Sequence, residues 1–240
     1  MQPSCFRYGD KTYVYSVRFL STRKKTVSIH VHPDASVEVK APTETSAQKI
    51  VEVITKRARW VVRHVEQMRE HQSLILPREY ISGESHFYLG RRYQLKVMRS
   101  KSSQVKLLQG YFRVEVEQIE PEHVKQLLYS WYQEHARILF RRRMREVVGS
   151  IPWVDEMPPL AVRLMAKQWG SCSPKGRISL NWHLAKAPLD CIDYVIMHEL
   201  CHLKEHNHSK KFYALMDKLY PDWKPVKAKL DGMAEMLLNE

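Results

Sequence analysis

The segment His198-Glu199-Leu200-Cys201-His202 constrains the fold more than any other part of the chain, because its chemistry requires a helix. Two histidines four residues apart lie one turn apart on one helical face, so both imidazoles can reach one metal ion. Glu199 can then point at a water bound to that ion. This is the H-E-x-x-H pattern of zinc hydrolases, which predicts Glu199 as the catalytic base.

A hydrolytic zinc site needs a third protein ligand and an open position. His206 would continue the same face, but three ligands at this spacing form a line about 12 Å long, which one ion cannot span. His208 would be turned about 240° away from His202 in an unbroken helix, so it can bind only if the helix ends between them. Asn207 permits such a turn, because asparagine tolerates left-handed dihedral angles. We therefore predict one Zn²⁺ held by His198, His202 and His208.

The plainer interpretation of this motif is a pair of surface histidines beside a surface glutamate. The preceding residues 191–197 are strongly apolar, which is typical of a helix buried against a core. Such a helix would place His198 and Glu199 next to that core. The sequence therefore favours a metal centre.

The charge of the chain is unevenly distributed. Lys and Arg number 39 against 26 Asp and Glu, and residues 1–150 hold 27 of the basic and 15 of the acidic side chains. Residues 151–240 are close to neutral, with 12 basic and 11 acidic side chains. A basic first half suggests a surface that faces a polyanion, which makes DNA a candidate partner; the plainer alternative is a solvated face.

Composition also bounds the compartment. The cysteines are too few and too scattered for a disulfide framework. No apolar run approaches the roughly 18 residues of a membrane span, and residues 1–13 lack the apolar core of a secretory signal. We therefore expect a cytoplasmic protein without a membrane partner.

Strand-like and helix-like patterns divide the chain, and no internal repeat is evident. Runs of β-branched and aromatic residues predict strands at 13–17, 26–31, 37–39, 85–89, 93–97, 105–108, 111–116, 160–167 and 177–182. Apolar residues at helical spacing predict helices at 43–65, 121–149, 189–203 and 212–219. We place the main boundary near residue 118.

Several segments of the second half resemble one known family. They are residues 167–173 (KQWGSCS), residues 178–181 (ISLN), residues 193–202 with the histidine motif, and Asn207-His208-Ser209-x-x-Phe212. Together they resemble the YgjP-like branch of the SprT-type zinc metallopeptidases. The resemblance extends to the first half, around Trp60 for example, and covers nearly the whole chain.

This resemblance implies an α+β fold with a β-rich basic region at residues 1–118. A zincin-like catalytic domain at residues 119–240 would follow, built from an active-site helix and a small mixed sheet. A protein or peptide substrate could pair with the edge of the strand at 178–181. The residues expected to line the substrate cleft are Trp169, Gly170, Ser171 and Asn181. The plainer alternative for Trp169 and Asn181 is structural support of the site. Related SprT-type proteases act on proteins bound to DNA, which fits the basic first half.

Two other functions stay open. The charge asymmetry also fits a nucleic-acid-binding module with a mainly structural zinc site, which would be closed by four protein ligands. Hydrolysis of a non-peptide amide would use the same ligands and the same base.

Overall fold

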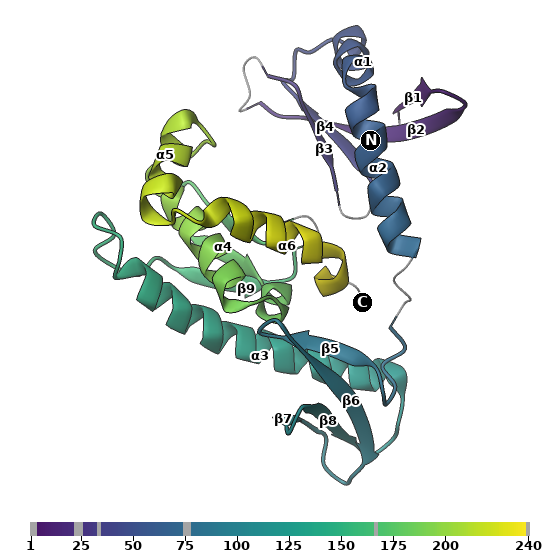
Figure 1. The fold of residues 1–240 in the computed structure, drawn as a ribbon, viewed down its shortest axis with the longest axis vertical. Helices are drawn as coiled ribbons and strands as arrows, with labels where there is room; N and C mark the ends of the chain where they lie inside the picture. Colours follow the sequence, from purple (N-terminus) through teal and green to yellow (C-terminus); the bar gives the residue numbers. More distant parts are fainter. Residues whose placement is uncertain (1–3, 22–25, 33–34, 74–77, 166–167, 239–240) are drawn as a thin grey trace. The chain divides into compact units, whose positions relative to one another are not determined.

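The computed structural model describes residues 4–21, 26–32, 35–73, 78–165 and 168–238, which form two compact units, Met1–Leu76 and Pro77–Glu240 (Figure 1). Both units combine small sheets with helices, so the predicted α+β class is confirmed. Lys167 of the family-like segment lies outside the described residues. No helix in the described ranges has the length and apolar character needed to cross a membrane.

The first unit is a four-stranded sheet followed by two helices. Its strands are β1 (Ser4–Tyr8), β2 (Lys11–Phe19), β3 (Ser28–Val31) and β4 (Val37–Ala41), in the order β1-β2-β4-β3. The central pair β2–β4 is parallel, and both outer pairs are antiparallel. Where the sequence predicts one helix, the structure has α1 (Ala47–Lys56) and α2 (Ala58–Ser73). The break falls at Arg57, whose main-chain N–H caps α1 by donating to the carbonyls of Ile54 and Thr55.

The second unit begins with a sheet of the same topology. Its strands are β5 (Ser85–Tyr88), β6 (Arg91–Arg99), β7 (Gln104–Leu108) and β8 (Tyr111–Val116), in the order β5-β6-β8-β7 with a parallel central pair. The chain therefore repeats a four-strand arrangement that the sequence did not reveal. Such a sheet requires only that apolar residues alternate along each strand, so two copies can share a topology with little sequence in common.

The long helix α3 (Pro121–Val148) packs against this second sheet. The rings of Phe112 on β8 and Trp131 on α3 meet edge to face, 4.9 Å apart. Because β8 and α3 share one core, the predicted boundary near residue 118 falls inside the second unit, and the compact units divide at residues 76 and 77 instead.

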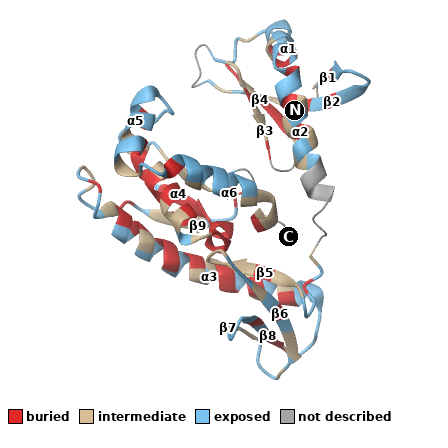
Figure 2. Ribbon diagram, viewed as in Figure 1, coloured by how far each residue is buried: buried red, intermediate tan, exposed pale blue. Residues whose placement is uncertain are grey.

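The rest of the second unit builds a three-stranded sheet and three more helices. The strands β9 (Leu160–Arg163), β10 (Gly170–Cys172) and β11 (Ile178–Asn181) pair in the order β10-β11-β9. A short 3₁₀ helix, η1 (Trp182–Lys186), leads into α4 (Leu189–Cys201), α5 (Lys210–Leu219) and α6 (Trp223–Leu238). Helix α4 is buried over most of its length (Figure 2), as its apolar sequence predicts. The sequence predicted neither β10 nor α6.

Candidate metal centre

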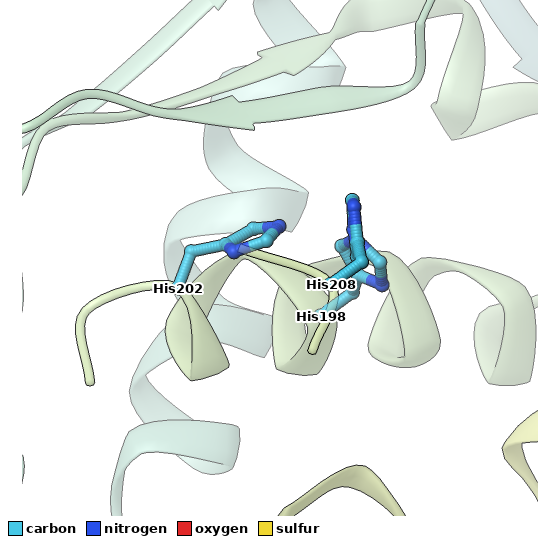
Figure 3. Close-up of side chains that lie close together, drawn as sticks. All are labelled: His198, His202 and His208. Atoms are coloured by element: carbon cyan, nitrogen blue, oxygen red, sulfur yellow. The ribbon is translucent and has the colours of Figure 1, made fainter. Parts of the chain in front are cut away.

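Three imidazoles from two helix ends meet in one place. Nitrogen atoms of His198, His202 and His208 all lie within 4.8 Å of one another, and Nε2 of His198 is 2.9 Å from Nε2 of His208. Figure 3 shows the three rings gathered on the same side of α4. The structure thus brings together the three histidines that the sequence predicts as ligands. His206 lines the surrounding cleft but does not belong to this group.

The end of α4 returns His208 to the two motif histidines. The helix ends at Cys201, with His202 as its C-cap, and the main-chain N–H of Glu205 donates to the carbonyl of Cys201 at 2.9 Å. The predicted left-handed turn at Asn207 is wrong, because the described residues with positive φ do not include it. Ser209 instead N-caps α5 by accepting from the N–H of Phe212, which fixes the position of His208 just before that helix.

Phe212 supports all three candidate ligands. It is fully buried in the first turn of α5, and its ring centroid lies 4.9, 4.6 and 4.8 Å from those of His198, His202 and His208. Contacts at this distance restrict the orientation of each imidazole. From the sequence, Phe212 is only one of the apolar residues of the predicted last helix and part of the family-like segment.

The hydrogen bonding and charge of these histidines suit metal binding. Nδ1 of His202 lies 3.0 Å from the carbonyl oxygen of Glu205. A carbonyl can only accept, so Nδ1 carries the proton and Nε2 keeps a free lone pair. Burial, with the neighbouring histidines, lowers the pKa of His198 to about 3, and burial also lowers the pKa of His202 and of His208. Neutral imidazoles are the form that binds metal ions, so the three residues fit such an ion.

Glu199 lies beside this group and beneath strand β10. Its side chain is almost completely buried, and its carboxylate accepts a hydrogen bond from the main-chain N–H of Cys172. Burial raises the pKa of Glu199 to about 8. A bound cation would oppose that shift, because it favours the ionised carboxylate.

The metal-binding group opens into a cleft of about 440 Å³. One wall is formed by residues 168–172, which include the predicted substrate-binding residues Trp169, Gly170 and Ser171. The structure does not bring Asn181 to this cleft. Asn181 is completely buried, and its amide donates to the carbonyls of Met165 and Gln168 and accepts from the N–H of His183. Asn181 therefore supports the segment that leads to Trp169.

A comparison with protein families agrees with this geometry. The model of the YgjP-like family, described as a metallopeptidase domain, matches residues 25–233. The chain belongs to the YgjP-like family. It is therefore a peptidase of the metal-dependent class, as the resemblance in its sequence implied.

Two solved structures are also similar to this YgjP-like chain. One is the metallopeptidase zymogen jannalysin of Methanocaldococcus jannaschii, with 21% identity over 40% of this chain and 96% of that chain, at a TM-score of 0.36. The other is the metallopeptidase zymogen abylysin of Pyrococcus abyssi, with 20% identity over 43% and 97% of the two chains, at a TM-score of 0.34. No curated protein matches the chain.

Helix α6 contributes a wall of the YgjP-like cleft that the sequence did not predict. Lys227, Leu230 and Asp231 line it, and Lys227 forms an ion pair with Asp231. Their spacing of three and four residues places them on one helical face. This spacing could have predicted a helix from the sequence. The indication is weak, because Gly232 and Pro225 interrupt the helical pattern.

Gly170 is expected to be indispensable for the position of Glu199. A Cβ atom at residue 170 would lie 2.8 Å from both Cγ and Oε1 of Glu199, closer than non-bonded atoms approach. We expect Gly170→Ala to displace the carboxylate and reduce peptidase activity at least about 100-fold, since a 1 Å misplacement has that effect. Gly149→Ala is the control, because Gly149 ends α3 with an ordinary helical φ of −59° and the nearest atom to an added Cβ would lie 3.5 Å away. This variant should keep nearly the wild-type activity. A matched comparison of turnover and zinc content of both variants tests this; equal activity of Gly170→Ala and wild type would contradict it.

Proposed function

We propose that this protein is a zinc-dependent peptidase in which Glu199 is the general base. The observation that carries the proposal is the convergence of three imidazoles beside one buried carboxylate. Three nitrogen ligands with an open fourth position are typical of catalytic zinc sites. When bound there, zinc would polarise the scissile carbonyl and lower the pKa of water to about 7.

The protein's own residues would then transfer the proton of the attacking water. Glu199 accepts it from the attacking water and delivers it to the leaving amine. The N–H of Cys172 holds the carboxylate in place throughout, and Phe212 keeps the imidazoles oriented. Tyr194 lines the same cleft one turn before His198 and is a candidate donor to the oxyanion.

Strand β10 is the edge on which we propose that a peptide substrate binds. The predicted edge at residues 178–181 is wrong, because β11 pairs with β10 on one side and with β9 on the other. β10 ends the sheet and lines the cleft. Main-chain groups of an extended peptide could pair with this edge, which would set the scissile bond near Glu199.

The alternative of a mainly structural zinc site has less support. It would require a fourth protein ligand, and in the described part of the chain the group consists of three histidines. The predicted contact with DNA, the association of substrates with nucleic acid, and the cytoplasmic location stay predictions.

Metal removal tests the proposal. The zinc-loaded protein is expected to cleave an unfolded protein substrate, to lose that activity on dialysis against a chelator, and to regain it with one equivalent of Zn²⁺. The reason is that the histidines alone can neither polarise the scissile carbonyl nor lower the pKa of the attacking water. Cleavage products are followed by mass spectrometry, with circular dichroism to show that the metal-free protein stays folded. Undiminished cleavage by the folded, metal-free protein would contradict it.

A further inference from the structure

The first unit carries an exposed face of four cations around one tryptophan. This Trp60 face consists of Lys56, Arg57, Arg59, Trp60 and Arg63, which line a hollow of about 490 Å³ where α1 ends and α2 begins. The opposite side of the two helices holds the core of the unit, including Ile54, Val61 and Val65. The Trp60 face therefore does not belong to that core.

The tryptophan on this face is unusually accessible. Trp60 is 43% exposed, whereas the other five tryptophans of the chain are buried or half-buried. His64 packs beside it, with ring centroids 4.4 Å apart, and its Nδ1 lies 2.9 Å from the carbonyl oxygen of Trp60. His64 thus steadies an indole that still presents much of its surface to solvent.

The positive charge of the face has no directly bound counter-ion among the described residues. In the described residues, none of its four cations forms an ion pair within 4.0 Å. Acidic side chains lie nearby on the same helices, but they have other partners. Glu52 binds Lys49 directly and interacts with Lys56 only at longer range. Glu66 binds Lys11 and the hydroxyl of Tyr13. In the first unit, Lys and Arg outnumber Asp and Glu by 13 to 7.

We infer that the Trp60 face binds single-stranded nucleic acid. Three of its four cations are arginines, whose planar guanidinium groups bind phosphate oxygens in pairs and also stack on bases. The indole offers a platform for one base, which requires a base that is not already stacked inside a duplex. A cationic hollow around an aromatic ring is the combination found in proteins that bind single strands without reading sequence.

This inference does not rest on the proposed peptidase function. The residues involved all belong to the first unit, whereas the metal centre belongs to the second. Peptidase activity and strand binding are measured in separate assays, so either proposal can fail without the other.

The test uses the full chain and a fluorescently labelled oligothymidylate of about 16 nucleotides, a length that one binding site can occupy. Fluorescence anisotropy gives the dissociation constant. Trp60→Ala is expected to weaken binding about 5- to 150-fold, because stacking of one base contributes about 1–3 kcal/mol, and Trp60→Phe is expected to retain most of the affinity. Arg59→Ala/Arg63→Ala is expected to flatten the slope of log affinity against log salt by about 1.4, the value for two phosphate contacts on a single strand.

The matched control is Arg7→Ala/Arg18→Ala, which removes two exposed charges from β1 and β2 of the same unit and should leave affinity within about twofold. Thermal melts establish that each variant is folded.

Three results would overturn the inference: no binding of the oligonucleotide by wild type, unchanged affinity in folded Trp60→Ala, or an equal loss in the control. Tighter binding of the matching duplex would also overturn it, as would Trp60-dependent binding of phosphatidylserine vesicles or polyglutamate in place of the oligonucleotide.

Discussion

Glu199→Gln is expected to abolish peptide cleavage while leaving zinc content unchanged. The amide has nearly the same shape as the carboxylate and can still accept from the N–H of Cys172, but it cannot take a proton from water. General base catalysis contributes about 10²- to 10⁴-fold to the rate, so the loss should be at least of that size. Because Glu199 is not one of the three converging ligands, the metal should remain bound.

Single-turnover cleavage of an unfolded substrate, measured beside the zinc-to-protein ratio, tests this directly. Glu205→Gln is the matched control, because it removes one carboxylate from the segment just after α4 and keeps the main-chain carbonyl that accepts from His202. Glu205→Gln should cleave at nearly the wild-type rate. Cleavage by Glu199→Gln at that rate would remove the basis for the proposed mechanism.

His208→Ala is expected to lose the metal and the activity together. Only His198 and His202 would then remain, and two imidazoles do not hold zinc as three do. Changes to groups that merely support a ligand already weaken metal binding about 10- to 100-fold, so loss of a ligand should exceed that range. Zinc bound after dialysis against a weak competing chelator gives the measurement.

His206→Ala provides the comparison for this variant. His206 lies two residues earlier and lines the same cleft, but it is outside the group of converging nitrogens. Its replacement should leave zinc content at the wild-type level. If His206→Ala lost zinc and His208→Ala kept it, the assignment of the third ligand would be reversed.

The sequence predicts the convergence of the three histidines because the information for it is local. The spacing of His198 and His202 requires one helical face, and the apolar residues before them require burial; both are properties of α4 alone. His208 could be chosen over His206 by geometry, since a straight helix cannot bring three ligands to one ion. The mechanism of the turn was harder to predict, because the cap at Ser209 replaces the expected left-handed residue.

Features that depend on pairing between distant segments could not be predicted. Strand β10 has only three residues and exists through its pairing with β11, so its glycine and serine looked like a turn. Asn181 was expected at the cleft because it belongs to the family-like segment 178–181, yet its amide donates to the main-chain carbonyls of Met165 and Gln168. The unit boundary also depends on long-range packing, because α3 joins β8 in one core.

The contact of Phe212 with all three imidazoles ties metal affinity to the docking of α5. His208 directly precedes Ser209, the N-cap of α5, so an ion held by the three histidines and the docking of that helix would stabilise one another reciprocally. A ligand present at 100 times its dissociation constant stabilises the state that binds it by about 2.7 kcal/mol. Bound zinc would therefore stabilise the docked position of the segment beyond residue 208. At a low zinc concentration, α5 and α6 would detach from the rest of the second unit more readily.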